Sequence, residues 1–282
     1  MTSISRLLRL HELTPLKGLG QHFLTAQGSL DKIVAAAELT PEDVVLEIGA
    51  GLGTLTRALA EVAGRVVAVE IDSRLIPVLY EELDSYGNVQ IVEGDILSIE
   101  PGELIGSSAY KVVANLPYSI TSAVLRHLLE AQLPPRTMVV TVQREVAERI
   151  VARGGRMSLL AVSIQFYGRP RLLFRIKPGA FHPPPSVESA VVRIDRHTQQ
   201  PVPVADTAAF FRIARAGFSQ PRKQIRNSLA GSLGLAPQQV ASALEQSGLN
   251  YHQRAERLRL DDWADVLNAL KPLMPEFDAD DV

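Results

Sequence analysis

Short, almost continuous apolar runs alternate with amphipathic segments through the first half of this chain. Five runs predict strands, at residues 44–49, 65–71, 89–94, 111–116 and 137–143, and helical patterns such as LTRALAEVAG lie between most of them. Apolar strands separated by helices form a parallel sheet that helices cover on both faces. The sequence therefore predicts an α/β fold built on a parallel sheet.

The pattern changes after residue 157. PRLLFRI (170–176) and ESAVVRID (188–195) predict an additional antiparallel pair of strands, and the polar stretch RHTQQPVPVAD then interrupts the hydrophobic pattern. From Thr207 to Leu273 the periodicity is helical. A chain of 282 residues that is 46% hydrophobic can bury the core of one large domain and a smaller one. We therefore expect an α/β domain over residues 1–200 and a small all-helical domain over residues 201–282.

The composition excludes several kinds of site. With no cysteine, the chain forms neither a disulfide nor a thiolate metal site, and it fits a reducing cytoplasm. The six histidines never fall at metal-ligand spacings, so we expect no metal. No run of about eighteen apolar residues is present, and the N-terminus lacks the apolar core of a secretory signal. We therefore expect a cytoplasmic protein that does not cross a membrane.

The net charge of −2 conceals a strong asymmetry. Residues 136–227 carry 16 Lys and Arg against 5 Asp and Glu, whereas the segments on either side are acidic. A basic surface in an otherwise acidic chain favours a polyanionic partner. Charge alone leaves open the alternative of a solvated surface without a partner.

Three glycines stand where the first predicted strand ends and a helix begins. Gly49, Gly51 and Gly53, in LEIGAGLGTLT, let the backbone turn sharply and approach a ligand closely. Glu70 ends the second strand, 21 residues after Gly49, where a carboxylate can accept both hydroxyls of a ribose.

Asp95, in GDIL, ends the third strand, where its carboxylate can accept a hydrogen bond from the amine of an adenine. Ile71 and Ile96 would then pack on the ring, so the sequence predicts an adenosine-containing cofactor. An NAD site requires G-x-G-x-x-G, but this loop is G-x-G-x-G, and there is no obvious acid or base for hydride transfer. S-adenosylmethionine fits better, because it has a ribose and an adenine but no pyrophosphate.

The stretch NLPYSIT follows the predicted strand YKVVA and needs its own explanation. Proline ends a strand because it lacks an N–H and has a fixed φ, which accounts for Pro117 alone. Strand termination does not explain Asn115 or Tyr118.

Taken in order, these motifs resemble those of the ribosomal RNA adenine N6,N6-dimethyltransferases, most closely the branch that acts on small-subunit RNA. The matching segments, between residues 20 and 229, are GQHFL, EIGAGLG, VEID, GDIL, NLPY, FHPPPSVESAVV and FSQPRKQIRNSL. The resemblance implies a Rossmann-like class I methyltransferase fold with a seven-stranded, mostly parallel sheet, a small helical C-terminal domain and S-adenosylmethionine as cofactor. It also implies dimethylation of adjacent adenines near the 3′ end of small-subunit rRNA, as a step of ribosome biogenesis.

The resemblance also assigns residues and a partner. The residues expected at the cofactor are His22, Leu24, Gly49, Gly51, Glu70, Ile71, Asp95, Ile96 and Asn115. The expected partner is small-subunit rRNA within an assembling small ribosomal subunit, bound by a monomer of this chain.

The chemistry of adenine then accounts for NLPY. Its N6 amine is a poor nucleophile, because the lone pair is delocalised into the ring. We expect the Asn115 side-chain oxygen and the Leu116 carbonyl to accept from N6–H and so localise the lone pair, with Pro117 holding the loop rigid. Tyr118 can stack on a base extruded into the pocket. Phe181 is a candidate for the opposite face, because family enzymes have an aromatic residue there; the alternative is a core anchor.

The basic excess ends in RIARAGFSQPRKQIRNSL, for which we expect helices at residues 209–216 and 221–230. Lys223 and Arg226 would then share one helix face. We expect Arg222, Lys223 and Arg226 to contact RNA phosphates without reading bases. Alternatively, Arg226 and Asn227 dock the small domain onto the catalytic one.

Three other functions are weaker alternatives. FSQPRKQIRNSL matches the small-subunit branch rather than the antibiotic-resistance branch that methylates large-subunit rRNA, although Pro221 stands where a basic residue is expected. Enzymes that methylate DNA adenine or a protein amide use N-P-P-Y, whereas Leu116 replaces the first proline here. A non-catalytic RNA-binding factor would lack Glu70, Asp95 or Asn115, and all three are present.

Overall fold

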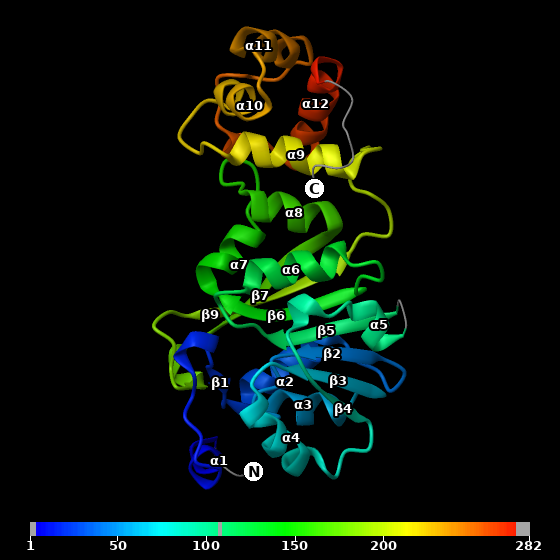
Figure 1. Cartoon of the computed structure of the whole chain (residues 1–282), viewed down its shortest axis with the longest axis vertical. Coiled ribbons are helices and arrows are strands. Elements are labelled where there is room, and N and C mark those ends of the chain that lie inside the picture. The colour runs from blue at the N-terminus through cyan, green and yellow to red at the C-terminus, as the bar shows by residue number, and fades with distance from the viewer. Residues whose placement is uncertain (1–3, 107–108, 275–282) are drawn as a thin grey trace. The chain divides into compact units, whose positions relative to one another are not determined.

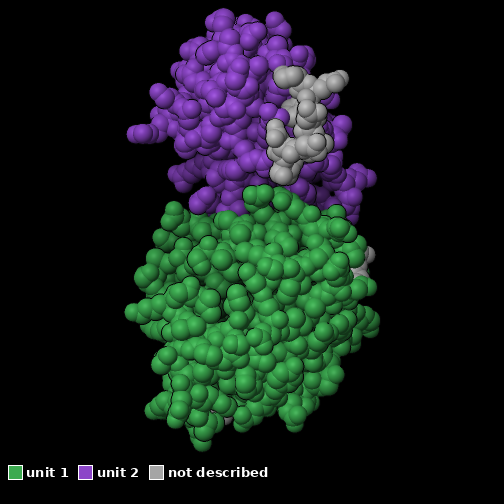
Figure 2. Space-filling view, in the orientation of Figure 1, with its two compact units in different colours: residues 1–148, 169–196 green, residues 149–168, 197–282 purple. Residues whose placement is uncertain are grey.

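The computed structural model of the chain describes residues 4–106 and 109–274. It divides into two compact units, which Figure 2 colours separately. The first is Met1–Glu148 with Arg169–Arg196, and the second is Arg149–Gly168 with His197–Val282.

The second unit thus includes residues 149–168, which lie upstream of the single boundary expected at residue 200. The reason is α8 (Leu159–Tyr167), several of whose side chains, such as Val162 and Phe166, belong to the hydrophobic core of the C-terminal helices. The Phe166 ring, for example, stacks on the Phe210 ring with centroids 4.7 Å apart.

The first unit is built on a seven-stranded sheet in the order β4-β3-β2-β5-β6-β9-β7 (Figure 1). The strands are β2 (Val44–Ile48), β3 (Arg65–Glu70), β4 (Val89–Glu93), β5 (Tyr110–Asn115), β6 (Thr137–Gln143), β7 (Gly168–Ile176) and β9 (Ser189–Arg196). The pairs among β2 to β6 are parallel, and β9 is antiparallel to β6. The predicted mostly parallel sheet is confirmed, and the five predicted strands agree with β2 to β6 within one residue at each end.

Both faces of this sheet are buried. Val45, Val66 and Val113 pack in one hydrophobic cluster with side chains of α2 (Gln27–Ala37) and α3 (Thr54–Ala60). The alternate positions, such as Leu46 and Val67, are 0% exposed as well. Burial on both faces explains why the central strands β2, β3, β5 and β6 are mostly apolar, whereas the edge strand β4 is only partly buried. The other helices with residues in this unit are α1 (Ile4–Leu10), α4 (Ile76–Leu83), α5 (Pro101–Ile105), α6 (Thr121–Glu130) and α7 (Arg144–Ile150).

The strand order reverses at β2, which lies between β3 and β5. In open α/β sheets, ligands bind outside the carboxyl ends of the strands at such a point. A separate two-stranded pair, β1 (Phe23–Leu24) with β8 (Phe181–His182), joins the N-terminal segment to the segment between β7 and β9.

The C-terminal part of the second unit is helical, as predicted. Its helices are α9 (Thr207–Phe218), α10 (Ile225–Leu233), α11 (Pro237–Gln246) and α12 (Leu260–Leu270). They pack around Trp263, which is 0% exposed. None of the described helices is long and apolar enough to cross a membrane.

The predicted helix at residues 221–230 begins later than expected. Residues 220–223 form a turn in which the Lys223 N–H donates to the Gln220 carbonyl at 3.0 Å, and Gln224 has an extended backbone. α10 therefore starts at Ile225, and the prediction that Lys223 and Arg226 share a helix face is wrong. The predicted helix at residues 209–216 lies within α9.

Candidate active site

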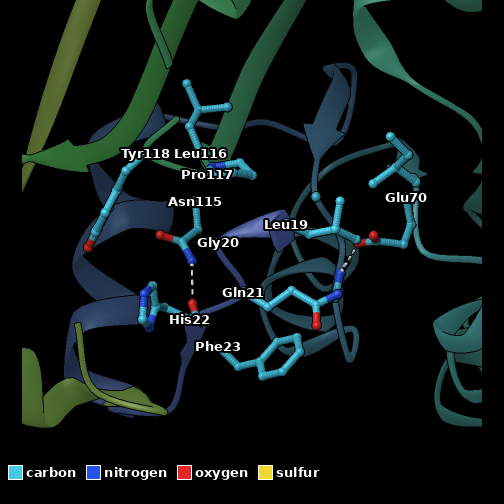
Figure 3. Close-up of a pocket in the computed structure, with 13 residues that line it drawn as sticks. Leu19, Gly20, Gln21, His22, Phe23, Glu70, Asn115, Leu116, Pro117 and Tyr118 are labelled. Atoms are coloured by element: carbon cyan, nitrogen blue, oxygen red, sulfur yellow. Dashed lines mark hydrogen bonds between the residues drawn. The ribbon is translucent and has the colours of Figure 1, made fainter. Parts of the chain in front are cut away.

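A pocket opens at the carboxyl ends of β2, β3 and β5, where the strand order reverses (Figure 3). Its walls come from the N-terminal segment, the glycine loop after β2, the end of β3 and the chain that leaves β5. The lining residues are Leu19, Gly20, Gln21, His22, Phe23, Gly49, Gly51, Glu70, Ile71, Asn115, Leu116, Pro117 and Tyr118. Nine of these were predicted as cofactor or catalytic residues, and the structure brings those nine together.

The glycine loop has left-handed backbone at all three glycines, with φ of +74° at Gly49, +61° at Gly51 and +75° at Gly53. Side chains rarely adopt this conformation. A Cβ on Gly51 would also lie 3.0 Å from the ring of Phe23. The loop therefore needs glycine for its shape, and at Gly51 also for its close approach to Phe23.

We predict that Gly51→Ala destabilises the chain, because it combines a left-handed φ with overlap on Phe23. The backbone conformation alone should cost about 1–2 kcal/mol, measurable as a lower midpoint in urea. Gly28→Ala is the matched control, since Gly28 lies in α2 and its added Cβ would meet nothing within 4 Å beyond its chain neighbours and its own helix backbone. Gly28→Ala should be neutral or stabilising, and equal losses in the two variants would contradict this account.

Glu70 ends β3 and is only 5% exposed. Its Oε2 accepts from the Gly51 N–H at 2.8 Å, and its Oε1 accepts from the Asp72 N–H at 2.9 Å. Burial raises the pKa of Glu70, although these two hydrogen bonds act in the opposite direction. Because each carboxylate oxygen can accept more than one hydrogen bond, Glu70 fixes the glycine loop and still offers acceptors to a ligand.

The N-terminal segment forms one wall, and polar contacts that the sequence did not reveal hold it there. Gln21 Nε2 donates to Asp72 Oδ2 at 2.7 Å, and Gln21 Oε1 accepts from the Leu16 N–H at 2.7 Å. Gln21 and Phe23 belong to the motif GQHFL, from which only His22 and Leu24 were predicted as site residues. Their place in that motif was the one signal that could have found them.

Asn115 ends β5, and the N-terminal segment orients its amide. Nδ2 of Asn115 donates to the His22 carbonyl at 2.9 Å. The side-chain oxygen is therefore turned away from that carbonyl, toward the side where the rings of Tyr118 and His22 lie (Figure 3). The following residue is also fixed, because the Leu116 N–H donates to the Thr141 carbonyl at 3.1 Å. The pocket thus presents a fixed hydrogen-bond acceptor.

Tyr118 is held by contacts at its hydroxyl and at its ring. The hydroxyl lies 2.7 Å from Oγ of Ser189, which is fully buried. The His22 ring stacks on the Tyr118 ring with centroids 5.8 Å apart and planes at 28°. Nδ1 of His22 donates to the Pro183 carbonyl at 2.7 Å, since a carbonyl can only accept. A base that stacks on Tyr118 must therefore use its other face or displace His22.

Leu24 and Phe181 lie outside the pocket. They are paired across β1 and β8, and both are buried in one hydrophobic cluster, with Phe181 4% exposed. Leu24 lines an adjoining cavity. This placement of Phe181 fits the alternative of a core anchor, and its stacking role stays a prediction.

Asp95 and Ile96 also lie outside the set of lining residues. Asp95 Oδ1 accepts from the Leu97 N–H at 3.0 Å and caps a short 3₁₀ turn, while Ile96 is 3% exposed. Their contacts with an adenine stay a prediction.

The three predicted RNA-binding residues lie in the second unit. Arg222 and Lys223 are exposed in the turn before α10. Arg226 is half-buried, and its guanidinium lies 5.3 Å from the centroid of the Tyr251 ring. Arg226 therefore packs within its own unit. Within residues 4–106 and 109–274, no group of three His, Asp or Glu side chains could hold a metal ion.

This chain has the fold and site of a class I methyltransferase. The features that define the class are the strand order, the glycine loop after β2 and the buried carboxylate at the end of β3. A family model described as ribosomal RNA adenine dimethylase matches residues 16–271. The chain therefore belongs to the ribosomal RNA adenine dimethylase family, as the motifs predicted.

Individual relatives agree with this family. The chain is 47% identical over 264 residues to the ribosomal RNA small subunit methyltransferase A of Dehalococcoides mccartyi, covering 93% of this chain and 91% of that one. The protein of the same name from Pelotomaculum thermopropionicum is 40% identical over 280 residues, with coverage of 94% and 95%.

Two solved structures are also similar. The 23S rRNA methyltransferase ErmE has a TM-score of 0.70 at 29% identity, covering 88% of this chain and 99% of that one. A dimethyladenosine transferase from Plasmodium falciparum has a TM-score of 0.76 at 24% identity, covering 89% and 98%, and supports the fold alone.

The predicted cofactor of this class and family, S-adenosylmethionine, is confirmed by the family match. When bound, it supplies an electrophilic methyl group on a sulfonium. The residues present fit it: Gly51 leaves the wall free of a Cβ, and the Glu70 carboxylate would accept from ribose hydroxyls. Ile71, which follows Glu70 and is 50% exposed, has free apolar surface beside the pocket, and its contact with the adenine stays a prediction.

Proposed function

We propose that this chain transfers methyl groups from S-adenosylmethionine to N6 of adenines, dimethylating adjacent adenines near the 3′ end of small-subunit rRNA. The observation that carries the proposal is the fixed amide of Asn115, whose nitrogen is bound to the His22 carbonyl. Its oxygen is left as an acceptor for N6–H. A second acceptor, the Leu116 carbonyl, follows directly in the chain.

The role of these acceptors follows from the chemistry of the amine. Two hydrogen bonds from N6–H favour a pyramidal nitrogen, whose lone pair is then available to attack. Fixed dipoles of this kind lower a barrier because they do not reorganise during the reaction. No side chain has to act as general base, since the methylated nitrogen loses its proton readily to water.

The choice of RNA rests on the relatives. The two bacterial relatives, at 47% and 40% identity, are named for the small subunit, whereas ErmE, at 29%, is named for 23S rRNA. The segment FSQPRKQIRNSL supports the same choice. We further propose that the substrate is an assembling small subunit in the cytoplasm and that the chain acts as a monomer.

Methyl transfer to different nucleic acids tests this choice. We would incubate the chain with S-adenosylmethionine labelled in the methyl group and with immature small subunits, large-subunit rRNA or adenine-containing DNA. The proposal requires label in the small-subunit RNA well above the other two. Preferential labelling of large-subunit rRNA would favour the alternative that ErmE represents.

We also propose that Arg222 and Lys223 contact RNA phosphates. Both are exposed before α10. The double change Arg222→Glu with Lys223→Glu should weaken RNA binding and flatten its dependence on salt by about one unit of slope per lost contact. The measurement is RNA binding across a range of salt concentrations.

Arg226→Ala provides the comparison, because Arg226 packs on Tyr251. It should lower the melting temperature more than the double change does. If the double change instead lowers the melting temperature and leaves the salt slope unchanged, Arg222 and Lys223 are structural.

A further inference from the structure

Glu47 is a buried acid that the site described above does not use. It lies on β2 and is 1% exposed. Neither of its carboxyl oxygens has a hydrogen-bond partner in the described part of the chain, and the same holds for the buried hydroxyl of Thr56. A charged carboxylate is costly to bury without a partner. The ligand-free chain therefore has a strong reason to keep this group protonated.

The surroundings of Glu47 also favour its protonated form. Burial, together with the negative charge of Glu70, raises the pKa of Glu47 to about 8. The Thr56 hydroxyl acts in the opposite direction, although it does not meet hydrogen-bond geometry with either carboxyl oxygen. Glu70 is the charged group that acts on Glu47, and no Lys, Arg or His is among the residues that line the cavity beside it. None of the described residues that line this cavity therefore supplies a cation to this carboxyl group.

That cavity continues from the active-site pocket. Glu47 lines it, and Phe23, Gly49, Gly51 and Asn115 line both the cavity and the pocket. A ligand in the pocket can therefore extend one end toward Glu47, and a cation on that end would meet an acid with no other positive partner.

We propose that Glu47 is a proton-coupled counter-ion for the methyl donor: it is a neutral acid in the ligand-free chain and ionises when a cationic group of the donor enters the cavity. The proton leaves the carboxyl oxygen for solvent, and the carboxylate then pairs with the ligand cation. This inference rests on the proposed function. S-adenosylmethionine carries an ammonium and a sulfonium, either of which has the required charge.

Calorimetric titration with S-adenosylmethionine at pH 7, in phosphate and in Tris, measures the protons released on binding, because the two buffers differ in ionisation enthalpy. Wild type should release close to one proton more than Glu47→Gln. The affinity of wild type should rise with pH between about 6 and 8 more steeply than that of Glu47→Gln. The amino group of the free ligand is already mostly protonated at pH 7, so it contributes little to the difference between the two proteins.

Two ligands and two further variants make the result specific. S-adenosylhomocysteine lacks the sulfonium but keeps the ammonium. If proton release with it is undiminished, the ammonium is the cation that pairs with Glu47; if proton release is smaller, the sulfonium is that cation. 5′-Methylthioadenosine lacks both cations and should release no proton through Glu47. Glu47→Asp, which keeps a carboxyl group, should retain proton release. Glu103→Gln, a change at an exposed acid in α5, should behave as wild type.

The melting temperatures of wild type and Glu47→Gln, both measured without ligand, provide a test that needs no cofactor. The folded chain holds the Glu47 proton more tightly than the unfolded chain does, so the contribution of Glu47 to stability is lost as pH rises from 4.5 to about 8. Glu47→Gln should therefore melt at a higher temperature than wild type at pH 8, with a smaller difference at pH 5.

The possible failures are distinguishable. If wild type and Glu47→Gln release the same number of protons, the inference about Glu47 is wrong while the proposed function stands. If wild type does not bind S-adenosylmethionine at all, both are wrong.

Discussion

Replacing Asn115 by alanine should slow methyl transfer by on the order of 10²-fold or more, the scale of losing one pre-organised polar group. The substitution removes the acceptor that we assign to N6–H. The fold should survive, because β5, which carries residue 115, is held by backbone pairing with β6. The measurement is the single-turnover rate on immature small subunits at saturating cofactor.

Asn88→Ala is the matched control for this prediction. Asn88 also uses its Nδ2, which donates to the Ala60 and Ala63 carbonyls at 2.9 Å, but it does not line the pocket. It should lower stability and leave the rate per folded molecule close to wild type. A near-normal single-turnover rate for Asn115→Ala would remove Asn115 from the catalytic role.

Glu70→Ala should weaken binding of S-adenosylmethionine by about 2–4 kcal/mol, or roughly 30- to 1000-fold in Kd. The ribose loses a charged acceptor. The glycine loop also loses the hydrogen bond of 2.8 Å from the Gly51 N–H to Glu70 Oε2 that holds it in place. Calorimetric titration of the ligand measures the change.

Glu93→Ala separates a site effect from a general effect of removing an acid. Glu93 is paired with Glu70 across β3 and β4, but it is exposed and does not line the pocket. Its replacement should leave the Kd close to the wild-type value. An unchanged Kd for Glu70→Ala would mean that the ribose binds elsewhere.

Much of this fold was predictable because its main signal is local. Apolar runs bounded by turn residues predicted β2 to β6 within one residue, since burial on both faces leaves the central strands little choice of side chain. The division into units was less predictable. α8 joins the C-terminal helices through contacts such as that of Phe166 with Phe210, which are far apart in sequence. The start of α10 was missed because it depends on a turn at residues 220–223 rather than on periodicity.

The site was predictable where a motif fixes the backbone, and less so where distant segments meet. Gly49, Gly51 and Glu70 follow from strand ends that a parallel sheet places at one edge. The contact of Asn115 with the His22 carbonyl joins residues 93 positions apart, and nothing in the local pattern reveals it. The same holds for Tyr118 and Ser189, which are 71 positions apart.

The central claim is that this chain places two methyl groups on N6 of adenines in small-subunit rRNA. Mass spectrometry of nucleosides and of 3′-terminal fragments tests it most directly, after immature small subunits are incubated with methyl-labelled S-adenosylmethionine and either wild type or Asn115→Ala. We predict N6,N6-dimethyladenosine with two labelled methyl groups in the 3′-terminal fragment with wild type, and little or none with the variant. Label on an atom other than N6, or none in the small-subunit RNA, would contradict the account.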